Sequence, residues 1–177
     1  MIHGTHNAIE DPKNANIQIM INDTLYDRKD AKISVFDSGY LVGDGIWEAF
    51  RLHKGSLAFA DMHLNRLWSA AASVGMEFPF SKKELLEKVW RVIEANHMED
   101  HVHVRVMITR GIKKTPSQDP RLTISGPNVV IIAEHKKASQ HSKEKGITLF
   151  TSTIRRGSPD YLDPRLNCHS KLHEVQA

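Results

Sequence analysis

The sequence has little cysteine, no long apolar segment and no concentrated block of charge of one sign. Its single cysteine, Cys168, excludes an internal disulfide and is typical of a reducing compartment. No stretch approaches the roughly 20 apolar residues that a transmembrane helix needs. The polar stretch from Met1 to Asn16 contains no apolar run of the signal-peptide type. We therefore expect a cytoplasmic protein with no membrane partner.

The basic residues also show little clustering. The formal net charge is +3, but the lysines and arginines are spread along the chain and form no basic helix or stripe. Aromatic residues, at 7% of the chain, are not interleaved with them in the way that base stacking requires. We therefore predict no nucleic-acid partner. Hydrophobic residues make up 40% of the 177 positions, enough for a core in one domain, or in one domain plus part of another.

The hydrophobic patterns predict an α+β fold with a mixed, mainly antiparallel sheet and two packed helices. One helix would be capped by Asp61 and end at Gly75, and a second would open with the capping box Ser81 to Glu84. A short helix is expected from Lys171 to Ala177. The predicted strands are Ile17–Ile21, Thr24–Tyr26, Ala31–Phe36, Ile46–Leu52, Leu57–Phe59, Val102–Thr109, Val129–Ala133 and Ile147–Ser152.

Loops and linkers divide the chain. Residues 1–14 are expected to form a loose arm, and Asp37–Gly39 with Gly43–Gly45 would bracket a tight loop. A long loop from Ile112 to Pro127 is of a length that is often functional. We place an N-terminal domain at residues 1–135, a charged linker at 136–146 and the start of a second domain at 147–177.

Two predicted strands carry polar residues on one face. Trp47, Ala49 and Arg51 alternate with apolar residues in the first strand, and His103 and Arg105 do so in the second. Such a face could line a cleft that binds substrate. For Arg51 an edge strand with a wet arginine explains the pattern equally well, and for the second strand a simple polar outer face does.

Two cations have a possible chemical role. Arg66 lies near the predicted start of a helix, where backbone N–H groups and a guanidinium can bind a phosphate, although a surface arginine is the commoner case. Lys171 follows small polar residues. A lysine in a partly dry pocket loses its proton more easily, and the neutral amine can form a Schiff base with an aldehyde. The other interpretation is a first-turn lysine that extends to water.

Several segments in order resemble the fold-type IV pyridoxal-phosphate enzymes, the class IV aminotransferases, which include branched-chain aminotransferases, D-amino acid transaminases and aminodeoxychorismate lyases. The resemblance covers the chain from about Ile17 to its last residue. The matching segments are Asp37-Ser38-Gly39, Gly43-Asp44-Gly45-Ile46-Trp47-Glu48, Arg51-Leu52-His53-Lys54-Gly55, His63-Leu64-Asn65-Arg66-Leu67 with Ser69-Ala70, Arg105 with Thr109-Arg110-Gly111, and Ser170-Lys171-Leu172.

The resemblance implies a D-amino acid aminotransferase-like fold with pyridoxal 5'-phosphate as cofactor, and amino-group transfer between an amino acid and a 2-oxo acid. Lys171 would be the Schiff-base lysine and general base, and Arg66 would bind the cofactor phosphate. Trp47, Ala49, Arg51, His103 and Arg105 would contact substrate. The family also implies a homodimer, with the loop after Gly111 covering an active site.

The chain departs from this pattern in two ways. The family continues for a second domain that here is only begun, so an acidic residue opposite the pyridine nitrogen would lie beyond Ala177. The glycine pair and tyrosine typical of branched-chain enzymes after the lysine are replaced by His173-Glu174-Val175-Gln176. Side-chain preference stays open. An aminodeoxychorismate-lyase-type reaction, or an inactive dimerisation domain, is the alternative function.

Two other sites were weighed on the residues alone. Cys168 with a histidine would suit a cysteine hydrolase, but the adjacent His169 points away from it in an extended chain. His101 and His103 share a face of a strand, yet no third metal ligand is evident from the sequence. We predict no metal site.

Overall fold

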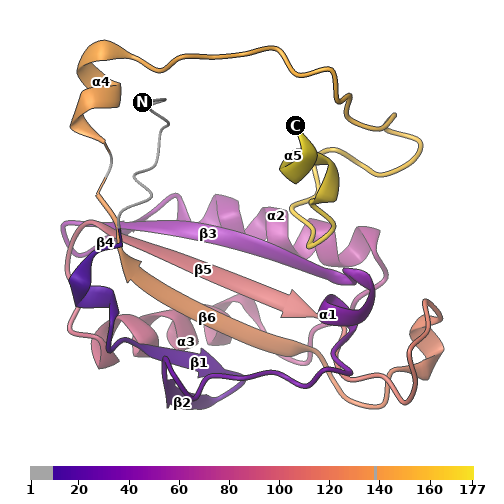
Figure 1. The fold of residues 1–177 in the computed structure, drawn as a ribbon. Coiled ribbons are helices and arrows are strands. Elements are labelled where there is room, and N and C mark those ends of the chain that lie inside the picture. The colour runs from indigo at the N-terminus through magenta and orange to yellow at the C-terminus, as the bar shows by residue number, and fades with distance from the viewer. Residues whose placement is uncertain (1–9, 138) are drawn as a thin grey trace.

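The computed structural model describes residues 10–137 and 139–177, which form a six-stranded sheet with two long helices on one face (Figure 1). The sheet order is β2-β1-β6-β5-β3-β4, and every pair is antiparallel rather than mixed. The strands are β1 (Gln18–Ile21), β2 (Thr24–Asp27), β3 (Gly45–His53), β4 (Ser56–Ala58), β5 (Val102–Thr109) and β6 (Asn128–His135). The helices are α1 (Ser38–Val42), α2 (Ala60–Ser73), α3 (Lys82–Ala95), α4 (Gln140–Lys145) and α5 (Leu172–Gln176), with 3-10 turns η1 (Pro12–Asn14) and η2 (Pro120–Leu122).

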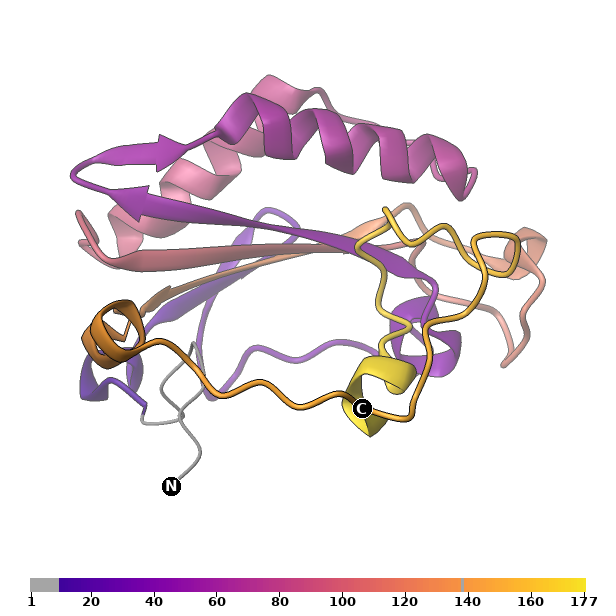
Figure 2. The same cartoon turned by 90° about the horizontal axis from the view of Figure 1, so that it is seen from above.

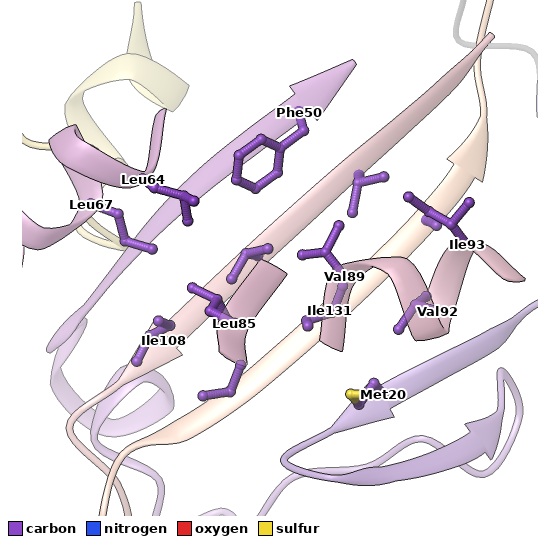
Figure 3. Packing of buried hydrophobic residues seen from close by; sticks show 14 of the residues in the cluster. Met20, Phe50, Leu64, Leu67, Leu85, Val89, Val92, Ile93, Ile108 and Ile131 are labelled. Atoms are coloured by element: carbon purple, nitrogen blue, oxygen red, sulfur yellow. The ribbon is translucent and has the colours of Figure 1, made fainter. Parts of the chain in front are cut away.

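The core lies between the sheet and the two long helices, as predicted for a two-layer α+β domain. Helix α2 packs on β3, and α3 packs on β6 and β1. One face of each central strand supplies the apolar side chains, because alternate residues of a strand point to the same face. Figure 3 shows these side chains meeting those of the helices; the labelled ones are Met20, Phe50, Leu64, Leu67, Leu85, Val89, Val92, Ile93, Ile108 and Ile131.

The sheet's other face is turned toward the C-terminal part of the chain. Figure 2 shows α2 and α3 on one side of the sheet and α4 and α5 on the other. The segment between α4 and α5 runs along this second side without joining the sheet as a strand. The polar strand face predicted from the sequence is therefore the face opposite the helical layer.

Helix α3 forms where its sequence signals place it. The Ser81 hydroxyl accepts from the backbone N–H of Glu84 at 3.2 Å, and the Glu84 carboxylate accepts from the backbone N–H of Ser81 at 2.7 Å. This reciprocal capping box satisfies N–H groups that a helix start leaves without partners. The predicted boundaries of β5 are also those observed.

Short elements in the first half of the chain were predicted wrongly. Residues 31–36 form no strand, because their apolar side chains Ile33, Val35 and Phe36 are exposed and no neighbouring strand is available. The predicted tight loop at 37–45 contains α1, which Asp37 caps by accepting from the Gly39 N–H at 2.8 Å. Gly43, at φ 71°, ends that helix in the left-handed region that favours glycine.

Three further expectations are corrected. Asp61 lies inside the first turn of α2, whose N-cap is Phe59 without a side-chain cap. The linker at 136–146 contains α4, which is capped by Ser139 accepting from the Ser142 N–H at 3.2 Å. Residues 147–152 form no strand, since they are exposed and no sheet edge pairs with them.

Part of the predicted N-terminal arm lies outside the described residues, and its end forms η1. None of the helices within residues 10–137 and 139–177 has the length and apolar character needed to span a membrane.

Candidate active site

The candidate substrate residues share the face of the sheet opposite α2 and α3. In the antiparallel β3–β5 ladder, Ala49 pairs with Arg105 and Arg51 pairs with His103. The Arg105 guanidinium lies 4.4 Å from the centre of the Trp47 ring, a cation–π contact between diagonal neighbours. The prediction that these five side chains belong to one face is confirmed, and their roles stay predictions.

Arg51 lies inside the sheet, so the edge-strand interpretation of this residue is wrong. It pairs with Ala58 of β4 on one side and with His103 of β5 on the other. Its guanidinium Nη1 donates to the carbonyl oxygen of Lys136. Arg51 therefore ties the beginning of the C-terminal segment to the polar face, and its head group is not simply in water.

The segment that carries Lys171 is attached to the first half of β3, where β4 leaves the strand edge open. The backbone N–H of Trp47 donates to the Asn167 carbonyl at 2.8 Å, and the N–H of His169 donates to the Gly45 carbonyl at 2.9 Å. The Trp47 indole Nε1 donates to the Cys168 carbonyl at 3.1 Å. These bonds bring the residues just before Lys171 to one end of the polar face.

Glycine at position 45 permits this close approach. A Cβ at Gly45 would lie 2.8–3.0 Å from three ring atoms of His169, closer than carbon atoms tolerate. The His169 ring is largely buried, and its Nε2 has no hydrogen-bond partner among the described residues. Burial lowers the pKa of His169, so the imidazole is neutral at physiological pH.

Lys171 is the N-cap residue of α5 and lines a cavity of about 530 Å³ in the C-terminal segment. Its Nζ lies 3.0 Å from Glu174 Oε1, and the Arg156 guanidinium reaches the same oxygen at 3.1 Å. Burial opposes ionisation of Glu174, but hydrogen bonds from Lys171 and Arg156 outweigh it and lower the pKa of Glu174 to about 2. The cavity thus contains two cations held by one carboxylate.

Arg66 belongs to a separate charged cluster on the helical side of β3. Its Nη2 donates to Glu48 Oε2 at 2.8 Å, its Nε donates to Oε1, and His63 Nδ1 lies 2.9 Å from Oε2. Glu48 is 1% exposed. Burial alone would raise the pKa of Glu48, but the hydrogen bonds from Arg66 and His63 lower it.

The structure brings some predicted site residues together and keeps others apart. Arg66 lies in the middle of α2 rather than at its N-terminal N–H groups, so the expected helix-start anion site is not formed there. Among the described residues, Arg66 pairs with Glu48 and Lys171 with Glu174, with no contact between the two cations. Both clusters flank the first half of β3, because Cys168 forms a bridge with Ile46, two residues before Glu48.

The sequence analysis did not identify Glu48, Arg156 or Glu174 as site residues. Glu48 had a visible signal, since a carboxylate alternates with the apolar residues of β3 and must find a partner when it is buried. Arg156 lies in an irregular segment, and only the tertiary structure shows that it meets Glu174. The Cys168 thiol is buried and lies 3.7 Å from the Ser170 carbonyl, which gives no support to a cysteine hydrolase.

Comparisons with known proteins identify the family. The model for amino-transferase class IV matches residues 45–177. The chain belongs to the class IV aminotransferase family. It is 34% identical to branched-chain-amino-acid aminotransferase-like protein 1 of Arabidopsis thaliana, over 94% of this chain and 30% of that protein. It is 32% identical to the aminodeoxychorismate lyase of Bacillus subtilis, over 90% of this chain and 53% of that protein.

Solved structures of class IV aminotransferases share the fold. The branched-chain aminotransferase of Thermoproteus uzoniensis, solved with norvaline, superimposes with a TM-score of 0.77 at 18% identity, covering 92% of this chain and 55% of that one. The 4-amino-4-deoxychorismate lyase of Pseudomonas aeruginosa gives 0.68 at 19% identity, covering 90% and 55%. Other branched-chain aminotransferases of this fold contain N-(5'-phosphopyridoxyl)-L-glutamate or pyridoxamine 5'-phosphate. The chain thus spans about half of these structures, and the predicted fold class is confirmed.

Proposed function

We propose that this class IV aminotransferase family member transfers an amino group between an amino acid and a 2-oxo acid, with pyridoxal 5'-phosphate as cofactor. The observation that carries the proposal is the attachment of the Lys171 segment to β3 beside Trp47. That attachment places a primary amine near one end of a face that carries Arg51, His103 and Arg105. A cofactor seen in solved relatives supports the choice of group.

The donor set of this chain suits pyridoxal phosphate. The cofactor needs an amine for its aldehyde, cations for its phosphate and an apolar wall for its ring. Lys171 supplies the amine, and the cavity it lines also contains Arg156 and the ring of Tyr161. When bound, the cofactor supplies an aldehyde that condenses with amines and an electron sink for the substrate's α-carbon.

Lys171 would hold the cofactor and move a proton at its Nζ. In the structure this ammonium is paired with Glu174 and its side chain is 29% exposed, so it is not a dry amine. Reaction with an aldehyde requires Nζ to leave that carboxylate and lose its proton. Since Arg156 also binds Glu174, it can keep the carboxylate neutralised once Lys171 has moved.

The arginines would bind the anionic groups. Arg66 uses Nε and Nη2 for Glu48, which leaves Nη1 to donate to a phosphate. Arg105 is exposed above Trp47 and has the planar, two-pronged geometry that suits a substrate carboxylate. His103 and Arg51 extend the same face and would set the orientation of the substrate.

Trapping with borohydride tests the role of Lys171 without requiring turnover. The chain is incubated with pyridoxal phosphate, reduced, digested and mapped by mass spectrometry. We expect the phosphopyridoxyl group on Lys171, its loss in Lys171→Ala, and its retention in the control Lys136→Ala. Labelling confined to other lysines would refute the assignment. No labelling of any lysine would favour the inactive dimerisation domain over an enzyme.

A lyase of the aminodeoxychorismate type is the second candidate, because a family member with that activity covers 90% of the chain. The two reactions differ in their co-substrate. A lyase releases pyruvate from its substrate alone, whereas a transaminase turns over only after a 2-oxo acid is added. The homodimer and the cytoplasmic location are further proposals, and light scattering of the purified chain tests the first.

A further inference from the structure

Three metal-ligating side chains meet at the end of the sheet that is remote from the Lys171 segment. His53 is the last residue of β3, and Asp100 and His101 immediately precede β5. The pairing of Leu52 with Val102 brings these two chain segments together. One potential ligand atom from each of the three residues lies within 4.8 Å of those from the other two. The Lys171 segment bridges β3 at Ile46, at the strand's opposite end.

The Asp100 carboxylate is held in a fixed orientation by the backbone. Its Oδ1 accepts from the N–H of Lys54 at 3.0 Å and from the N–H of His101 at 2.7 Å. The same oxygen lies 3.0 Å from His53 Nδ1. Groups that orient a ligand from outside the coordination sphere are a regular part of metal sites. Here two backbone amides have that role, and they need no additional side chain.

The spacing of the nitrogen and oxygen atoms fits one ion. Asp100 Oδ2 lies 3.6 Å from His101 Nε2, which is longer than a hydrogen bond. In a tetrahedral zinc site with metal–ligand bonds of about 2.0–2.1 Å, neighbouring ligand atoms are roughly 3.3 Å apart. The observed spacings of 3.0 and 3.6 Å lie on either side of that value. Small side-chain rotations are therefore enough to close the site around a cation.

We propose that His53, Asp100 and His101 bind one divalent transition-metal ion of the zinc type. Two imidazoles and one carboxylate suit Zn²⁺, Ni²⁺ or Cu²⁺ better than Mg²⁺ or Ca²⁺, which prefer oxygen ligands. Both imidazoles are about half exposed, so water has access to the remaining coordination positions. Backbone hydrogen bonds, chiefly from Lys54, lower the pKa of Asp100 to about 2, so its carboxylate is charged near neutral pH.

A bound ion would join the β3–β4 turn to the start of β5. These two segments are already connected by the contacts of Asp100, so the ion strengthens an existing joint rather than creating one. Because the ion binds the folded chain, the unfolding temperature should rise with its concentration. This inference does not depend on the proposed transaminase activity, since the site lies away from the candidate active site.

Zinc titration by calorimetry tests the proposal, with Co²⁺ absorbance as a second readout of tetrahedral coordination. Wild-type protein should bind Zn²⁺ at this site and show the visible Co²⁺ band, while Mg²⁺ should give neither signal. His53→Ala and His101→Ala should weaken this Zn²⁺ binding by more than the roughly 10- to 100-fold typical of changes outside the coordination sphere. Both should also lose the Co²⁺ band and the Zn²⁺-dependent rise in unfolding temperature.

His97→Ala is the matched control, because His97 is exposed and lines a surface cavity together with His101 but is not in the cluster. It should bind Zn²⁺ as the wild type does. Asp100→Asn keeps an acceptor for the Lys54 and His101 amides and removes the charge, so loss of binding in this variant does not reflect a broken loop. Wild-type protein that binds no Zn²⁺, or His53→Ala and His101→Ala variants that bind it unchanged, would overturn the proposal.

Discussion

Replacing Arg66 with alanine should destabilise the fold far more than loss of a surface ion pair. Glu48 is 1% exposed, and Arg66 and His63 are its side-chain partners in the structure. Removing one partner of a buried pair costs about 3–5 kcal/mol, because the other charge stays buried. The Arg66 side chain is 50% exposed, so water can replace part of what it donates. We therefore expect a loss of about 2–3 kcal/mol, discounted from that range.

Arg91→Ala is a close control for this change. Its side chain is 52% exposed, almost the same as that of Arg66, and it also projects from a long helix. Its partner Asp23 is 69% exposed, so the pair should contribute about 0–1 kcal/mol. Urea unfolding followed by circular dichroism measures both variants. For a chain of this size, 2–3 kcal/mol corresponds to a fall in Tm of about 4–12 °C.

The same cluster predicts a dependence on pH. The folded-state pKa of Glu48 lies below its ordinary value of 4.5. The contribution of the ionised carboxylate to stability is therefore fully present above that value and is lost as the pH falls through the folded pKa. The difference in stability between wild type and Glu48→Gln should shrink on acidification. An Arg66→Ala loss within about 0.5 kcal/mol of the Arg91→Ala loss would refute the reasoning, since surface substitutions scatter by that much.

Three further changes have definite expected results. Gly45→Ala places a methyl group against the His169 ring and should cost about 1–3 kcal/mol, with altered tryptophan fluorescence as the segment shifts; wild-type stability and emission would contradict the close approach. Ser81→Ala removes one half of the capping box with Glu84 and should cost about 1 kcal/mol in urea unfolding, with no change if the helix start is already frayed. Phe50→Ala empties a fully buried position and should cost about 3–5 kcal/mol, so a loss below 1 kcal/mol would mean that the core collapses around it.

Regular elements with a strong internal pattern were predictable from the sequence. Val102–Thr109 alternates strictly, and Ser81 with Glu84 marks the start of α3, so local geometry alone specified both. The two faces of β3 followed from the same alternation. Segments that depend on a partner were not predictable. Ile147–Ser152 has the composition of a strand, but in the structure no sheet edge lies beside it.

The candidate site divides in the same way. Residue types and their order along the chain were sufficient to identify the family and to select Lys171, Arg66 and the polar face of β3 and β5. Only the tertiary structure decided that Arg66 neutralises the buried Glu48 and that Lys171 shares Glu174 with Arg156. The physical reason is that periodicity along a chain determines which face a side chain occupies. Which charge it meets depends on segments that are distant in sequence and come together only when the sheet forms.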